Sequence, residues 1–219
     1  MSNTSADARF WDRIARKYAA DPIKDMAGYE RTIARTRHWL SASHTVLELG
    51  CGTGTSALLL APSVARIVGS DLSGEMVVIA TQTAAAQNCA NASFVVGAAE
   101  DAVAPDGSCD AVLAFNLLHL IADRRAALER VRRLLKPGGL FISKTPCLAE
   151  MNPLIRLAVP LMQLIGKAPH VSFFKAAALE DEIAAAGFTV LERDRHGSGR
   201  RDPRIFLVAR RDEAPGLDV

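Results

Sequence analysis

From residue 45 onward, short runs of apolar residues alternate with longer segments rich in alanine and leucine. The runs occupy residues 46–49, 66–69, 94–96, 111–115, 140–142, 188–191 and 204–210. The segments between them include residues 74–87, 124–135 and 176–186, which are long enough for helices. Apolar runs that alternate with helices are typical of parallel strands buried on both faces. The pattern therefore predicts an α/β fold with a mostly parallel sheet and helices on both faces.

Two further helices are predicted before the first strand. Apolar residues between Phe10 and Tyr18 recur at helical spacing, and a second helical pattern covers residues 28–40. We expect residues 9–40 to form a helical cap and residues 45–145 to form the core. Only the short loop 196–203 joins the last two runs, so these strands should be antiparallel neighbours.

One apolar segment, residues 152–166, lies within an insertion predicted at residues 147–174. It contains Arg156 and Pro160 and falls short of the roughly 20 apolar residues that a membrane-spanning helix needs. Three interpretations stay open: a lid over an apolar or amphiphilic small molecule, a helix packed between cap and core, or a helix on a membrane surface. The single basic residue makes the last interpretation the weakest, and we expect no transmembrane segment.

Composition and charge narrow the class of protein. The 219 residues suit a single domain over residues 1–219, with a tail at 212–219 that we expect to be disordered. Basic and acidic side chains number 26 and 24, so the net charge of +2 favours neither nucleic acid nor an acidic membrane as partner. The arginines at positions 193, 195, 200, 201 and 204 lack interleaved aromatic residues and should form a solvated face.

The cysteines and the N-terminus bear on location. Cys51, Cys89, Cys109 and Cys147 stand singly, with no spacing that suits a metal site or a redox pair. Residues 1–8 are small and polar and lack the charged start and apolar core of a secretory signal. We expect reduced thiols, no bound metal and a cytoplasmic location.

The first apolar run ends in a glycine-rich turn that opens a helix. Bare backbone at Gly50, Gly52 and Gly54 lets a ligand approach closely, at the sheet edge where α/β proteins bind ligands. The spacing departs from the dinucleotide pattern G-x-G-x-x-G, because Thr55 stands where the third glycine belongs. Glu48 at the strand end would repel a pyrophosphate, whereas it suits the cationic, phosphate-free S-adenosylmethionine.

The second run ends in another acid, Asp71. A carboxylate at this place can accept hydrogen bonds from both hydroxyls of a ribose. The alternative is that Asp71 only caps the helix that begins near Ser73. Together with Glu48 and the glycines, the residue favours a site for an adenosine compound.

Four segments, in this order, resemble the signatures of class I S-adenosylmethionine-dependent methyltransferases, particularly the ubiquinone/menaquinone-biosynthesis-like group (methyltransferase type 11). They are Glu-Leu-Gly-Cys-Gly-Thr-Gly at 48–54, Asp-Leu-Ser-Gly-Glu-Met at 71–76, Asn-Leu-Leu-His at 116–119 and Leu-Leu-Lys-Pro-Gly-Gly at 134–139. The resemblance extends from about residue 10 to residue 210. It implies a Rossmann-like seven-stranded, mostly parallel sheet with one antiparallel strand.

The resemblance also implies which residues bind S-adenosylmethionine. They are Tyr18, Glu48, Gly50, Cys51, Gly52, Gly54, Asp71, Leu72, Met76, Ala99, Glu100, Asn116 and Leu117. The glycine-rich turn would meet the methionine part, Asp71 the ribose, and Leu72 with Met76 the adenine face. Ala98 stands where the group usually has an acid, so Glu100 or the backbone of Ala99 must hold the adenine, which puts cofactor affinity in doubt.

Methyl transfer from a sulfonium mainly requires that the acceptor atom be aligned with the methyl group and that water be excluded. A base is needed where the acceptor is a hydroxyl or a protonated amine, and the candidates are His119, His170 and Glu150, in that order. A purely structural role is the more frequent outcome for His119. The leading hypothesis is methyl transfer to a small apolar or amphiphilic acceptor. The alternatives are a protein that binds the cofactor without transfer and, third, a dehydrogenase.

Overall fold

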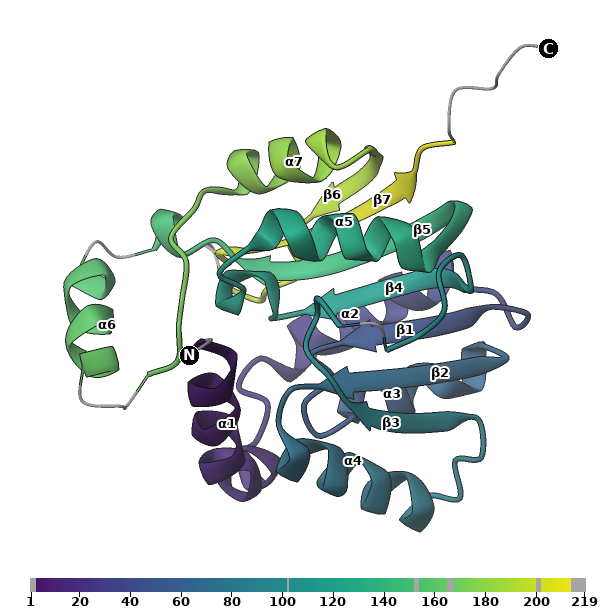
Figure 1. Cartoon of the computed structure of the whole chain (residues 1–219), viewed down its shortest axis with the longest axis horizontal. Helices are drawn as coiled ribbons and strands as arrows, with labels where there is room; N and C mark the ends of the chain where they lie inside the picture. Colours follow the sequence, from purple (N-terminus) through teal and green to yellow (C-terminus); the bar gives the residue numbers. More distant parts are fainter. Residues whose placement is uncertain (1–2, 102, 152–153, 165–167, 200–201, 214–219) are drawn as a thin grey trace.

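The computed structural model describes residues 3–101, 103–151, 154–164, 168–199 and 202–213 (Figure 1). Seven strands form one sheet in the order β3-β2-β1-β4-β5-β7-β6. They are β1 (Thr45–Leu49), β2 (Arg66–Asp71), β3 (Ala92–Val96), β4 (Cys109–Phe115), β5 (Leu135–Pro146), β6 (Phe188–Asp194) and β7 (Arg204–Arg211). The predicted fold class is confirmed. Most of the tail, residues 214–219, lies outside the described residues.

Strand direction follows the predicted scheme. Strands β1 to β5 pair in parallel, whereas β7 is antiparallel to both β5 and β6. The predicted antiparallel pairing of the last two strands is therefore confirmed. Because the parallel strands all end at one edge of the sheet, the turns that follow β1, β2 and β4 meet there.

Helices cover both faces of the sheet. They are α1 (Asn3–Ala20), α2 (Met26–Trp39), α3 (Thr55–Leu60), α4 (Gly74–Ala86), α5 (Arg124–Leu134), α6 (Leu154–Leu164) and α7 (Ala176–Ala185). Helices α5 and α7 share one core cluster, to which they give Leu128 and Ile183. Helices α2 and α3 share the other through Ile33 and Leu60. Helix α2, predicted as a cap, thus also covers a sheet face.

Several elements differ in length from the prediction, and α2 and β5 show the physical reasons most clearly. Helix α2 begins before residue 28 because Asp25 caps it, its Oδ1 accepting from the Gly28 N–H at 3.0 Å. Strand β5 was expected only at residues 140–142. It continues through polar Ser143 and Lys144, which the apolar pattern does not reveal but which pair with β7.

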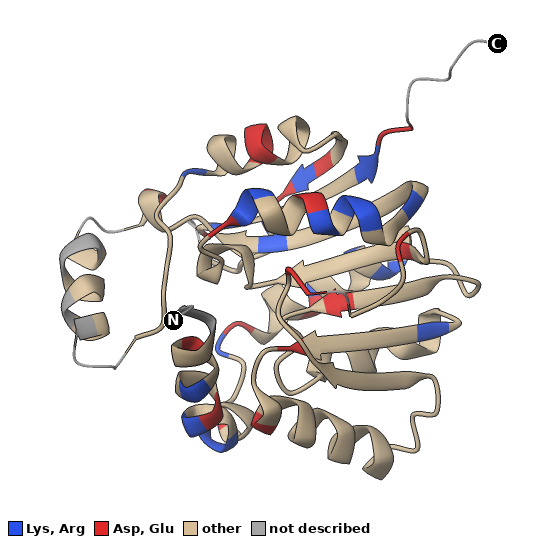
Figure 2. Cartoon of the chain, in the orientation of Figure 1, with Lys and Arg blue, Asp and Glu red and all other residues tan. Residues whose placement is uncertain are grey.

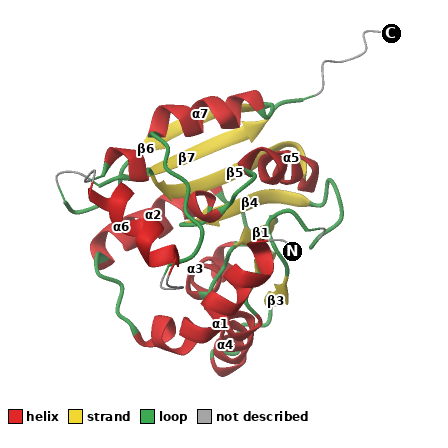
Figure 3. Cartoon of the chain, turned by 60° about the vertical axis from the view of Figure 1, so that its left-hand side comes forward, coloured by secondary structure: helices red, strands yellow, loops and turns green. Residues whose placement is uncertain are grey.

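Helices α1 and α6 lie outside the layers that cover the sheet, near the edge at which the parallel strands end (Figure 3). Asp12 holds α1 against the start of α4, since its Oδ1 accepts from Ser73 Oγ at 2.6 Å and from the Glu75 N–H at 3.2 Å. Helix α6 stands at the side of the molecule (Figure 1), with Leu154 and Met162 exposed. Of the helices in the described ranges, none is both long and apolar enough to cross a membrane. Basic and acidic residues are interspersed on α1 and α5 (Figure 2).

Candidate cofactor and acceptor site

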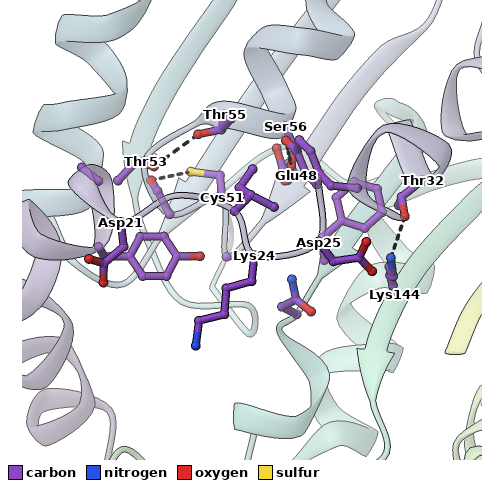
Figure 4. Close-up of a pocket in the computed structure, with 18 of the residues that line it drawn as sticks. Asp21, Lys24, Asp25, Thr32, Glu48, Cys51, Thr53, Thr55, Ser56 and Lys144 are labelled. Carbon is purple, nitrogen blue, oxygen red and sulfur yellow. Dashed lines mark hydrogen bonds between the residues drawn. The ribbon is translucent and has the colours of Figure 1, made fainter. Parts of the chain in front are cut away.

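A cavity of about 540 Å³ opens where β1 and β4 end. Its walls are the glycine-rich turn after β1, the segment 21–25 between α1 and α2, the inner side of α2, and the ends of β4, β5 and β7. Figure 4 shows polar side chains facing this space from several of these elements. The cavity therefore adjoins the turn that the sequence predicts for the cofactor.

Gly50 and Gly52 of the glycine-rich turn line this cavity, whereas Gly54 does not. Gly50, Gly52 and Gly54 all have positive φ, at 64°, 53° and 78°. A Cβ on Gly50 would lie 2.7 Å from Leu117 Cδ1, whereas a Cβ on Gly52 would meet only the Tyr18 ring, at 3.8 Å. Gly50 is thus required by packing, and Gly52 keeps the backbone accessible beneath Tyr18.

Glu48 is the buried acid of the cavity wall. It is 2% exposed, and its Oε2 has no hydrogen-bond partner among the described residues. Burial raises the pKa of the Glu48 carboxyl to about 8, opposed by a hydrogen bond from the Ala57 backbone and reinforced by nearby Asp71. A buried carboxylate oxygen without a partner is costly, and a ligand ammonium would satisfy it.

Asp71 is held by backbone N–H groups rather than acting as a helix cap. Its Oδ2 accepts from the Gly52 N–H at 2.9 Å and its Oδ1 from the Ser73 N–H at 2.9 Å. Ser73 is the cap of α4, since its Oγ accepts from the Met76 N–H. Burial raises the pKa of Asp71, and these hydrogen bonds oppose the rise. Each oxygen keeps a lone pair for a ribose hydroxyl.

A second cavity, of about 100 Å³, lies on the other side of this turn. Four predicted cofactor residues line it: Leu72, Ala99, Glu100 and Leu117. Trp11 of α1 closes it, and Asp101 stabilises the adjoining loop by accepting from the Ala98 N–H at 2.8 Å. Met76 is buried and is not among the residues that line either cavity.

Tyr18 and Asn116 frame the larger cavity. The ring of Tyr18 lies above the glycine turn and is half-exposed, and partial burial together with nearby Asp71 and Glu48 raises the pKa of its hydroxyl. Asn116 follows β4 with a φ of 52°, a left-handed conformation that asparagine tolerates better than most residues. The buried Cys51 also belongs to the lining.

The three candidate bases do not meet at this cavity. His119 is largely buried, its Nδ1 has no hydrogen-bond partner among the described residues, and burial lowers its pKa to about 4. His170 lines the smaller cavity beside α1, with its Nε2 3.3 Å from Ser172 Oγ. Glu150 accepts from the Ala176 N–H at 2.7 Å and pairs with Arg195 at 2.8 Å, so both oxygens are engaged. Neither His119 nor Glu150 lines the larger cavity.

The sequence prediction missed Lys144, which the structure places in the wall of the larger cavity. Lys144 is 5% exposed and its Nζ donates to Thr32 Oγ1 at 2.7 Å (Figure 4). His196 Nδ1 lies 3.1 Å from the same hydroxyl. Burial lowers the pKa of Lys144 to about 8. The available signal was a lysine two residues after a buried apolar run, near the carboxyl end of a predicted strand.

These residues fit S-adenosylmethionine. The unpartnered oxygen of Glu48 suits an ammonium, the open backbone at Gly52 suits the methionine chain, and Asp71 keeps acceptor positions for a ribose. Within the described part of the chain, no group of three or more histidine, cysteine or acidic residues could hold a metal ion.

Comparisons with known proteins agree with this geometry. Residues 46–139 match the family model described as a methyltransferase domain. The chain is 36% identical over 126 residues to the uncharacterized methyltransferase YcgJ of Bacillus subtilis, covering 54% of this chain and 50% of that protein. It is 30% identical over 154 residues to a demethylmenaquinone methyltransferase of Symbiobacterium thermophilum, covering 67% and 59%. The chain thus spans about half the length of the relatives it matches.

Solved structures show the same fold. Magnesium protoporphyrin IX methyltransferase of Synechocystis PCC 6803, solved with S-adenosylhomocysteine, superposes with a TM-score of 0.74 over 96% of this chain and 100% of that one, at 19% identity. The chain therefore carries a class I S-adenosylmethionine-dependent methyltransferase domain, and the predicted family and cofactor are confirmed.

Proposed function

We propose that the protein transfers a methyl group from S-adenosylmethionine to a small molecule bound in the 540 Å³ cavity. The observation that carries this proposal is the continuity of the site. Gly50 and Gly52 of the cofactor turn and Asn116 after β4 line the same cavity as Lys144, on the far side from the adenine residues. Bound there, the cofactor supplies an electrophilic methyl group on its sulfonium.

The chain's own residues would bind and align the two reactants. In this proposal, Glu48 and the backbone at Gly52 hold the methionine part, Asp71 holds the ribose, and Leu72 packs on the adenine. Asn116 lies between this half and the acceptor space. Helix α1 covers the turn through Tyr18 and helps to exclude water, which an in-line displacement requires.

We further propose that the acceptor is amphiphilic. The cavity wall beside the reacting centre is polar, with Tyr29, Thr32 and Lys144 facing it. Helix α6 exposes Leu154 and Met162, which suits a lid over an apolar remainder. One relative is named a demethylmenaquinone methyltransferase, which is consistent with such an acceptor. We place the reaction in the cytoplasm, as the sequence predicts.

Calorimetry and product detection test the proposal. The protein should bind S-adenosylhomocysteine, and with S-adenosylmethionine and a panel of quinols, phenols, fatty acids and amines it should release S-adenosylhomocysteine for some member. The matched control is Gly52→Val, which should abolish both signals because it places a branched side chain at a positive φ beneath Tyr18. Cofactor binding without turnover of any compound would instead favour a binding protein.

A further inference from the structure

Lys144 is a buried cation without an acidic partner. Its pKa of about 8 leaves the ammonium mostly protonated at neutral pH. Its hydrogen bonds go to Thr32 Oγ1, at 2.7 Å, and to the Gly28 carbonyl, at 3.5 Å. Among the described residues, no carboxylate forms an ion pair with it. Since an ammonium has three donors and an unpaired buried charge is costly, Lys144 lacks the partner that a buried charge normally has.

The acids around Lys144 are already engaged elsewhere. Asp25 accepts from the N–H groups of Gly28 and Ser198 and pairs with Arg204. Asp202 accepts from the Arg204 Nε at 2.7 Å through Oδ1; its buried Oδ2 has no hydrogen-bond partner among the described residues, and Asp202 does not line the cavity. Lys144 is therefore the buried cation of the cavity lining, and no carboxylate of the described residues is paired with it; Lys24, which also lines the cavity, is exposed.

Glu48 also has an unpartnered oxygen in the cavity wall, but it lies too far from Lys144 to be its ion-pair partner. Glu48 on β1 aligns with Leu113 on β4, which aligns with Ile142 on β5, and Lys144 is two residues further along β5. Strand spacing puts the two backbones on the order of 12 Å apart. This separation leaves room for a ligand between the carboxyl group of Glu48 and the ammonium of Lys144.

We propose that Lys144 binds an oxyanion of the methyl acceptor, so that the substrates of this site are carboxylic acids or acidic hydroxyl compounds bound as anions. This inference rests on the proposed function. The Lys144 ammonium holds the anion by a charge-assisted hydrogen bond, while Thr32 and the Gly28 carbonyl keep the side chain oriented. An apolar remainder of the acceptor is compatible with this arrangement.

Matched pairs of probes test it by calorimetry in the presence of S-adenosylhomocysteine: benzoate against benzamide, octanoate against octanamide, and 4-nitrophenol against 4-nitroanisole. The acidic members should bind at least about tenfold more tightly than the neutral ones. Lys144→Met should lower the affinity for the acids by about 10- to 100-fold, which is the range expected for a hydrogen bond to a charged group. The affinity for the neutral compounds should not change. Lys136→Met removes a lysine from the same strand, paired with Asp110 outside the cavity, and should change neither.

Three results would overturn the proposal. The acids could bind no better than their neutral partners, or none of the acids could bind to protein that binds S-adenosylhomocysteine. Alternatively, Lys144→Met could lower the affinity for S-adenosylhomocysteine as much as the affinity for the acids. Lys144 would then bind the carboxylate of the cofactor and not an anion of the acceptor. Failure of the proposed function is distinguishable, because the wild-type protein would then not bind S-adenosylhomocysteine or would methylate none of the compounds.

Discussion

The edge at which the parallel strands end has two halves: a cofactor half at the ends of β1 and β2, with Asp71, and a proposed acceptor half at the end of β5, with Lys144. The two halves hold their polar groups in different ways. In the cofactor half, Asp71 is fixed by backbone N–H groups of Gly52 and Ser73. In the acceptor half, Lys144 is fixed by the side chain of Thr32, which also contacts His196. Backbone donors persist when neighbouring side chains change, whereas a side-chain network does not. The acceptor half can therefore change specificity by substitution while the cofactor half stays intact.

The position of Glu48 between the two halves leads to the largest expected effect, a dependence of stability on pH. Its pKa of about 8 in the folded protein is above the ordinary carboxyl value, so the folded state binds a proton more tightly than the unfolded chain. The contribution is fully present below about pH 4.5 and is lost as pH rises through about 8. In denaturant titrations, the free energy of unfolding should fall by at most about 1.4 kcal/mol per pH unit in that window.

Glu48→Gln is the matched control for this titration. The variant keeps the shape of the side chain and removes the ionisable proton. The pH dependence of the free energy of unfolding between pH 5 and 8, which corresponds to about one proton, should therefore disappear. An unchanged slope in the variant would show that another group titrates and that Glu48 is not the buried acid of the cavity.

Asp71→Ala tests the backbone-held half. Loss of a hydrogen bond to a charged group should weaken S-adenosylhomocysteine binding by about 1.5 to 3 kcal/mol in calorimetry. Asp123→Ala is the control, because Asp123 also accepts from a backbone N–H, that of Ala126 at the start of α5, and itself lines neither cavity. It should cost about 1 kcal/mol of stability and no affinity. Equal affinities for the two variants would contradict the ribose assignment.

Glu150→Ala separates a structural role from the predicted catalytic one. Glu150 links the Ala176 N–H and Arg195, so the substitution should lower stability by about 1 kcal/mol in thermal or denaturant unfolding. Turnover per folded protein should not change, because Glu150 does not line the larger cavity. A loss of turnover above about 100-fold, with stability retained, would restore Glu150 as a base.

Asp12→Ala should have the smallest effect, confined to the attachment of α1. The substitution removes acceptors for Ser73 Oγ and the Glu75 N–H, worth about 0.5 to 1.5 kcal/mol. Hydrogen exchange should accelerate in α1 and not in the sheet. Asp21→Ala breaks only the exposed pair with Lys17 and should change exchange little. Equal exchange in both variants would show that Asp12 does not hold the helix.

The two halves also differ in how far their residues could be predicted from the sequence. The glycine turn and Asp71 are positioned by the strands that immediately precede them, so a local pattern was sufficient. Lys144 acquires its environment from Thr32, 112 residues earlier, and such a contact has no local signature. His119 was placed in the right part of the fold, but its low pKa results from burial that depends on tertiary packing.

Helix α2, which forms one wall of the larger cavity, can complete its contacts only after the end of the chain has been synthesised. Arg35 and Trp39 both bind Glu192, and Arg31 donates to the His196 carbonyl, at separations of 153 to 165 residues. During synthesis α2 emerges early, yet the groups that anchor it are among the last to be made. A truncation that removes residues 188–213 would therefore take away the groups that anchor α2, together with β7, whose Phe206 and Val208 belong to the same core cluster as α2.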